Sequence, residues 1–263
     1  MPWQNEMADL DDLKHRVHQE LAHQNAVVFA ATLDQLQNFQ PVLTACEQAR
    51  FDRVRLPDQR RLHGLGRGLV RYFLDLPRDD FTLGDDGKPR CSESTGAAGF
   101  FNISHTGRMI SVALHRHSDL GIDIETPTRG LRDETLVARV CHPKEAKWIA
   151  RHSQQNRPQA FLRCWVRKEA VLKAQGTGLV DDLQGINTHL QDRFPVLHAH
   201  GGLRLWDFPA GFSAAPGALA TRSDVARVSY LSPAGIMQQT WPSGPLEPVE
   251  VCTPEEVIDD SYV

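Results

Sequence analysis

Apolar residues recur along the chain with two kinds of spacing, one typical of helices and one typical of strands. A spacing of three and four residues predicts helices at 9–24, 43–55, 57–76, 131–140 and 143–152, and in a long segment that Pro158 begins. Alternating or continuous apolar runs predict strands at 26–31, 100–105, 109–115, 120–125, 185–190, 203–208 and 226–231. Two glycines, Gly176 and Gly178, end the long helix.

The stretch Gly121-Ile122-Asp123-Ile124-Glu125 alternates apolar and acidic residues, which predicts a short strand. Asp123 and Glu125 then point to one face, and the two isoleucines point into a core. Adjacent ionised carboxylates repel each other, so this face favours a bound cation. Oxygen ligands without nearby Cys or His indicate Mg²⁺ rather than zinc. For an isolated D-x-E pair, a polar edge strand is the plainer interpretation.

A second stretch, Cys164 to Lys173, changes that balance. On a helix, Trp165, Glu169 and Lys173 fall at i, i+4 and i+8, along one stripe. Taken alone, they form an exposed Glu–Lys pair, worth about 0.3–0.5 kcal/mol. Combined with the strand, the helix adds a third carboxylate and a lysine to one site. Such a set suits a magnesium-bound pyrophosphate whose leaving phosphate must be neutralised.

These residues resemble the signature of Sfp-type 4′-phosphopantetheinyl transferases. The matching segments are G-I-D-I-E at 121–125 and W-V-R-K-E-A-V-L-K at 165–173. The segment 101–107, F-N-I-S-H-T-G, looks like the family's F-N-I-S-H-S-G, with Thr in place of Ser. Gly87-Lys88-Pro89 resembles the G-K-P that precedes it. Four motifs occur in the family's order, and the likeness extends diffusely over about residues 26–240.

The resemblance implies an α+β fold of two similar α/β halves in a pseudo-twofold arrangement, with the site in the cleft between them. The amphipathic spacing at the start of the chain predicts an N-terminal helical extension at 1–24, packed on the surface or mobile and without assigned chemistry. The N-terminal half then covers 25–119 and the C-terminal half 120–242. A Pro- and acid-rich tail at 243–263 is expected to be poorly ordered.

The resemblance also implies an activity. The 4′-phosphopantetheine arm of coenzyme A is transferred to a serine of an apo acyl, peptidyl or aryl carrier protein, releasing adenosine 3′,5′-bisphosphate. The expected catalytic residues are Glu169, which takes the serine proton directly or through a water, and Lys173. Mg²⁺ is held by Asp123, Glu125 and Glu169. Coenzyme A is contacted by Arg61, Lys88, Ser104, His105, Lys168 and Lys173.

Two other function classes stay open. One is a different Mg²⁺-dependent enzyme that cleaves pyrophosphates with water as the nucleophile. The other is a non-catalytic carrier-binding module that has kept the fold, against which the intact acidic trio argues. The pathway that the carrier serves, whether fatty acid, polyketide or nonribosomal peptide synthesis, does not follow from the residues.

Length and composition agree with an ordinary globular protein. The chain has 263 residues, of which 41% are hydrophobic and 24% charged. It contains no apolar run of the roughly 20 residues that cross a bilayer, and no secretory signal is recognisable. The five cysteines are scattered and form no C-x-x-C motif. We therefore expect reduced thiols, a cytoplasmic location, a monomer and no membrane partner.

The formal charge of −4 is unevenly distributed. Residues 129–173 carry 11 Lys or Arg against 4 Asp or Glu, whereas 244–263 carry 6 acids and no bases. An overall acidic chain with few aromatics in its basic segment is not typical of nucleic-acid binding. The basic segment favours an acidic carrier protein, with Arg132, Arg139, Lys144, Lys147 and Arg151 as the docking residues. A solvated face is the alternative.

Overall fold

The structure is a computed structural model that describes residues 9–77, 81–84, 88–91, 99–127, 134–178, 182–209, 215–241 and 247–248. Its helices are α1 Leu10–Ala22, α2 Ala45–Phe51, α3 Pro57–Leu74, α4 Glu134–Val140, α5 Pro143–Ala150 and α6 Arg157–Gln175, with 3₁₀ turns η3 Leu183–Gly185 and η4 His198–His200. Its strands are β1 Ala26–Thr32, β2 Phe81–Leu83, β3 Pro89–Cys91, β4 Phe100–Thr106, β5 Met109–His115, β6 Leu120–Ile124, β7 Val196–Leu197, β8 Leu203–Pro209, β9 Pro216–Thr221, β10 Arg227–Ser232, β11 Gly235–Thr240 and β12 Glu247–Pro248. The mixed α+β class is thus confirmed.

Helix boundaries follow local signals. Thr44 and Glu47 form a capping box at the start of α2, and His142 and Glu145 form one at α5. Proline in the first turn begins α3, α5 and α6. Helix α6 ends at Gly176, whose φ of 70° lies in the left-handed region that favours glycine.

The described strands form two larger sheets and one hairpin. The first sheet has the order β12-β11-β10-β1-β5-β4, the second the order β6-β9-β8-β7, and β2 pairs with β3. Within the first sheet β1 pairs with β10 in parallel and with β5 antiparallel. Sheet membership therefore does not divide at residue 120, because β10–β12 return from the predicted C-terminal half to the N-terminal sheet.

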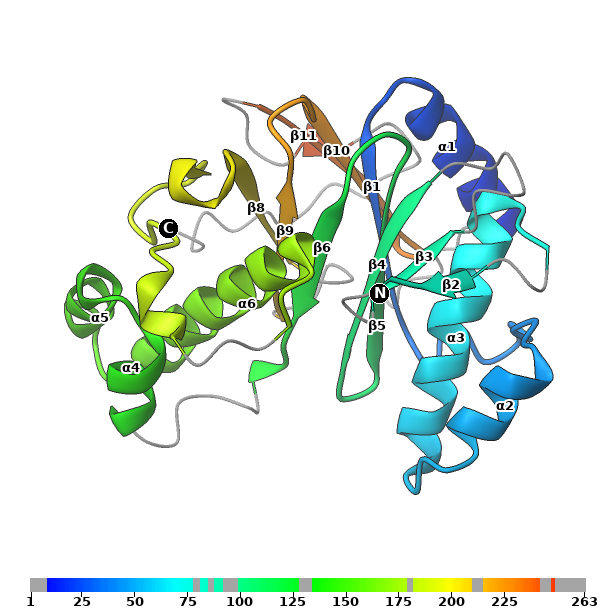
Figure 1. The fold of residues 1–263 in the computed structure, drawn as a ribbon, viewed down its shortest axis with the longest axis horizontal. Coiled ribbons are helices and arrows are strands. Elements are labelled where there is room, and N and C mark those ends of the chain that lie inside the picture. The colour runs from blue at the N-terminus through cyan, green and yellow to red at the C-terminus, as the bar shows by residue number, and fades with distance from the viewer. Residues whose placement is uncertain are drawn as a thin grey trace, which may run out of the picture.

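The helices and sheets form four layers in the order helix, sheet, sheet and helix (Figure 1), and an apolar cluster fills each of the three interfaces between them. Helices α1 and α3 cover one face of the first sheet, and the other face packs on the second sheet. Helix α6 covers the remaining face of the second sheet, where it packs on β6 and β9. A fourth cluster joins α4 and α5 to the start of α6.

Helix α1 is more deeply embedded than the expected extension. Leu13, Val17 and Leu21 are at most 2% exposed and belong to the same apolar cluster as β1 and α3. Glu20, also buried, accepts hydrogen bonds from Asn25 and from Gln238 of β11. Helix α1 is therefore an integral layer of the fold rather than a loose cover.

One predicted strand, at 185–190, is wrong. Its backbone groups are satisfied by side chains instead of a neighbouring strand. Thr188 N donates to Glu145 Oε1 at 2.7 Å, and Arg167 donates to the carbonyl oxygens of Thr188 and His189 at 2.9 and 3.1 Å. A segment held in this way has no free ladder of backbone groups to offer to a sheet.

The predicted tail at 243–263 lies outside the described residues, apart from the short strand β12. Within the described parts of the chain, no helix is both long enough and apolar enough to cross a lipid bilayer.

Candidate functional site

Asp123 lies on β6 and Glu125 directly follows this strand, both on the face that α6 covers. Ile122 and Ile124 point the other way, into the apolar cluster between the two sheets. Gly121 lies on the same face as the carboxylates, and a Cβ there would collide with the backbone of Ala170 and Ala174. The glycine thus lets α6 cross β6 in direct backbone contact. This close crossing brings the side chains of α6 within reach of Asp123.

Asp123 is 7% exposed and is held by two side chains from other elements. Lys173 Nζ on α6 lies 2.6 Å from Asp123 Oδ1, and Ser104 Oγ on β4 donates to the same oxygen at 2.8 Å. Burial nonetheless raises the pKa of Asp123; Lys173 and Ser104 act against that shift, and the charge of Glu125 adds to it. One lysine therefore does not compensate the buried negative charge, and an additional cation would be favoured here.

Glu125, 3% exposed, completes the acidic pair. Its Oε1 accepts a hydrogen bond from the Thr106 hydroxyl of β4, and from the backbone N of Thr126 at 3.1 Å. Asn102, the third residue on this face of β4, accepts from Ile122 N at 2.9 Å. The polar side chains of β4 thus join the two sheets where β4 and β6 lie side by side. Sequence reasoning missed Asn102 and Thr106, although their i, i+2 spacing around Ser104 was a readable signal.

Glu169 lies one helical turn before Lys173 on α6 and is half-buried. As predicted, Trp165, Glu169 and Lys173 are spaced one turn apart along α6. Lys173, the last of the three, contacts β6. Among the described residues, the acidic trio does not form a cluster whose ligand atoms all lie within 4.8 Å of one another. The ligand atoms that the trio offers are all carboxylate oxygens. This fits Mg²⁺, which usually takes one or two carboxylates and fills its shell with water and substrate phosphate.

His105 points to the opposite side of β4 from Ser104, as alternation requires. There it meets α3, where its ring contacts His63 edge-on with a centroid separation of 4.6 Å. Burial, with smaller contributions from His63 and Lys173, lowers the pKa of His105 to about 4. At neutral pH, His105 is therefore an uncharged hydrogen-bonding group. Nothing in the sequence pairs His63 with His105, so sequence reasoning missed this neighbour.

Lys88 lies where three segments meet. Its ammonium pairs with Asp119 and donates to the carbonyl oxygens of Leu120 and Lys173, each at 2.9 Å. With 9% exposure, it ties the start of β6 to the end of α6. Lys88 thus binds the backbone of the residue, Lys173, whose side chain pairs with Asp123.

The contacts that Arg61 and Lys168 make are with groups other than the carboxylates of Asp123 and Glu125. Arg61 Nη2 donates to the carbonyl oxygens of Leu36 and Gln37 at 2.9 and 3.0 Å. Lys168 is 1% exposed, pairs with Glu145 at 2.8 Å and donates to the Leu183 and Ile186 carbonyls. These contacts serve packing, and the expected contacts of both residues with coenzyme A stay predictions.

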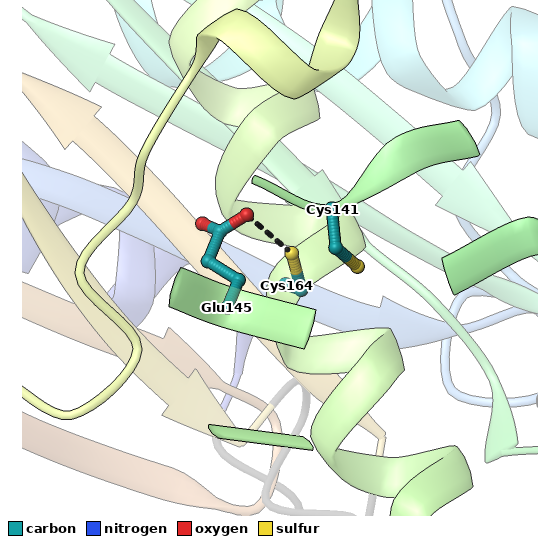
Figure 2. Close-up of side chains that lie close together, drawn as sticks. All are labelled: Cys141, Glu145 and Cys164. Carbon is teal, nitrogen blue, oxygen red and sulfur yellow. Dashed lines mark hydrogen bonds between the residues drawn. The ribbon is translucent and has the colours of Figure 1, made fainter. Parts of the chain in front are cut away.

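Figure 2 shows the buried cluster beside Lys168, in which the Glu145 carboxylate faces the Cys164 thiol and Cys141 lies next to it. Cys164 Sγ donates to Glu145 Oε2 at 3.3 Å, and burial raises the pKa of this thiol. A metal would require thiolates and, for zinc, a fourth ligand. Both Glu145 oxygens already accept hydrogen bonds from Cys164 and Thr188. The cluster is accounted for as packing between α5 and α6.

The basic segment divides into an internal and an exposed set. Arg163 and Arg167 bind Asp207 of β8; burial alone would raise the pKa of Asp207, and the two guanidinium groups lower it to about 2. These two arginines and Lys168 form internal ion pairs, whereas Lys173 is the cation of the candidate site. The exposed predicted docking residues are Arg139, Lys144, Lys147 and Arg151, on α4, α5 and the end of α5, and Arg132 lies outside the described residues.

Comparison with known proteins confirms the family resemblance. Residues 119–210 match the model of the 4′-phosphopantetheinyl transferase superfamily, a range that contains Asp123, Glu125, Glu169 and Lys173. The 4′-phosphopantetheinyl transferase HetI of Nostoc sp. is 32% identical over 154 residues, which are 55% of this chain and 64% of that protein. A putative 4′-phosphopantetheinyl transferase of Haemophilus influenzae is 45% identical over 85 residues, covering 30% and 34%. The transferase AcpT of Salmonella typhimurium is 32% identical over 111 residues, covering 42% and 56%. The matches span less than two thirds of these relatives.

Proposed function

We propose that this chain, whose residues 119–210 match the 4′-phosphopantetheinyl transferase superfamily, transfers the 4′-phosphopantetheine arm of coenzyme A to a serine of an apo carrier protein. The observation that carries the proposal is the junction of β4, β6 and α6. There, two buried carboxylates on one strand face, a lysine at 2.6 Å and a serine hydroxyl meet. The related halves in a pseudo-twofold arrangement belong to the same proposal, supported by one long helix packed on each sheet.

In the proposed reaction, the serine oxygen of the carrier attacks the phosphorus that bears the pantetheine. The bond from that phosphorus to the bridging oxygen breaks, and adenosine 3′,5′-bisphosphate leaves with the bond's electron pair. The proton of the serine passes to Glu169, or to a water that Glu169 orients. Lys173 neutralises charge on the leaving phosphate, for which it must exchange part of its contact with Asp123.

Mg²⁺, when bound, would withdraw charge from the pyrophosphate oxygens and hold them in place. Asp123, Glu125 and Glu169 would hold it. The chain's contribution is to keep two carboxylates buried and oriented, through Ser104 and Thr106, before any cation arrives. Such preorganisation avoids reordering of the site during the reaction.

In this proposal the carrier protein docks on four exposed basic residues, Arg139, Lys144, Lys147 and Arg151. They lie on or at the end of helices that pack against α6, the helix that carries Glu169. Positive charge there would steer an acidic partner and fix its orientation. A monomer in the cytoplasm belongs to the same proposal, and the free thiols Cys46, Cys91, Cys141 and Cys164 support a reducing compartment.

Mass spectrometry of a carrier protein incubated with the chain, coenzyme A and MgCl₂ tests this function. We expect the carrier to gain the mass of one phosphopantetheine, and the gain to disappear in EDTA. Cleavage of coenzyme A without a modified carrier would instead indicate a pyrophosphate-hydrolysing enzyme. A carrier that binds the chain while both molecules stay intact would indicate a non-catalytic binding module.

A further inference from the structure

His63 is held between two aromatic contacts on the α3 side of β4. Its ring stacks on Phe51 of α2 with a centroid separation of 5.6 Å and an interplanar angle of 14°. On its other side it meets the His105 ring at 4.6 Å and 83°. A stacked contact followed by an edge-on contact is a favourable aromatic geometry. The row Phe51–His63–His105 thus passes from α2 through α3 to β4.

The far end of this row is a residue of the proposed coenzyme A site. His105 has Ser104 as its chain neighbour, and the charge of Lys173 acts on its ring. Burial lowers the pKa of His63, and the charges of Arg50 of α2 and Arg67 of α3 add to this shift. Both rings are therefore uncharged at neutral pH. They act through ring shape and hydrogen bonds rather than as cations.

We propose that His63 is a positioning residue for coenzyme A: clamped by Phe51, its flat ring fixes the orientation in which His105 presents its imidazole to the ligand. The inference rests on the proposed function and adds a residue outside the family-like motifs. The alternation of β4 sets the side on which the His105 ring lies, but the terminal χ2 torsion of a histidine is broad. The edge-on contact with His63, together with a hydrogen bond between the ring and the backbone of His105 itself, limits that rotation.

The position calls for a ring rather than for a nitrogen atom. Among the described residues, no hydrogen bond uses a ring nitrogen of His63, whereas two ring contacts involve this residue. His63→Phe should therefore preserve the function of the residue, and His63→Ala should remove it. His117, an exposed histidine that follows β5 and contacts only the His115 ring among the described aromatic pairs, offers a matched control.

Calorimetric titration with coenzyme A in MgCl₂ tests the inference on the full chain. Loss of the aromatic contact in His63→Ala should weaken coenzyme A binding about threefold to tenfold, while His63→Phe and His117→Ala stay within about twofold of the wild type. In transfer assays, His63→Ala should raise KM for coenzyme A and spare kcat, because Asp123 and Lys173 lie on the other side of β4. If His63→Ala does not fold, His63→Gln takes its place, with the same expected loss.

Nitrogen-15 spectra of the imidazoles give an independent readout. The resonances of His105 should shift in His63→Ala and keep their positions in His63→Phe. Unchanged affinity in His63→Ala would overturn the inference, and so would an equal loss in His63→Phe, which would assign the effect to the His63 nitrogen atoms. A wild-type chain that does not bind coenzyme A would remove the proposed function as well, whereas binding that is insensitive to His63 would remove the inference alone.

Discussion

Deleting residues 1–22 removes helix α1, and we expect the shortened chain to lose most of its stability. Leu13, Val17 and Leu21 are almost fully buried against the first sheet and α3. Burying one such side chain contributes about 1.5–3 kcal/mol, so the three together contribute roughly 5–9 kcal/mol. Folded domains are typically stable by only about 5–15 kcal/mol. The deletion also takes Glu20 from its hydrogen bond with Gln238 of β11.

Urea unfolding followed by tryptophan fluorescence measures this loss, and Leu21→Ala provides a milder step of about 2–5 kcal/mol. The control is Lys14→Ala on the same helix. Its part-exposed ion pair with Asp75 is worth at most about 1 kcal/mol, and its position over the Tyr72 ring adds about 0.5–1 kcal/mol. A truncated chain with the urea midpoint of the full chain would refute the reasoning and return α1 to the status of a peripheral extension.

Three further predictions concern the site and its surroundings. Asp123→Ala should abolish transfer, as should EDTA on the wild type; full activity in EDTA would contradict the magnesium assignment. Asp207→Asn should lower the free energy of unfolding by about 2–3 kcal/mol at pH 7, because Arg167 and Arg163 lower the pKa of Asp207 in the folded chain. This stabilisation is fully present above the unfolded pKa near 4 and is lost as the pH falls toward 2. The gap in unfolding free energy between variant and wild type should thus narrow between pH 4 and pH 2, and a constant gap would argue against the ion pair. Arg139→Glu with Lys147→Glu should raise KM for the carrier, more so at low salt, and leave coenzyme A affinity unchanged; an equally efficient variant would mean that this face does not dock the carrier.

Much of the fold was readable because local signals agreed with it. Alternation marked β4 and β6, a nearly continuous apolar run marked β5, and proline and glycine marked the two ends of α6. The same alternation correctly placed Asp123 and Glu125 on one face. Strands β9 and β11 were not predicted, since β9 is built from small residues and β11 from glutamines as well as apolar residues.

The limits of the sequence appear where contacts join distant segments. The pattern marked Lys173 as a cation near the carboxylates, but its contact with Asp123 follows from the crossing of α6 over β6 at Gly121. From the sequence, both Lys168 and Lys173 are expected to contact coenzyme A. Five positions apart on a helix, they lie on different faces, and only one of them reaches β6.

The parallel pairing of β1 with β10 has a consequence for synthesis of the protein. Ala26 pairs with Val228, so the second edge of β1 is filled only after strand β10, about 200 residues later, has left the ribosome. Until then, a nascent chain that has paired β1 with β5 carries an open strand edge of Val and Phe, which can template aggregation. Contacts of such long range also slow folding. Ribosome-bound chains halted before residue 227 should therefore depend on chaperones, and chains that extend past residue 240 should be released from them.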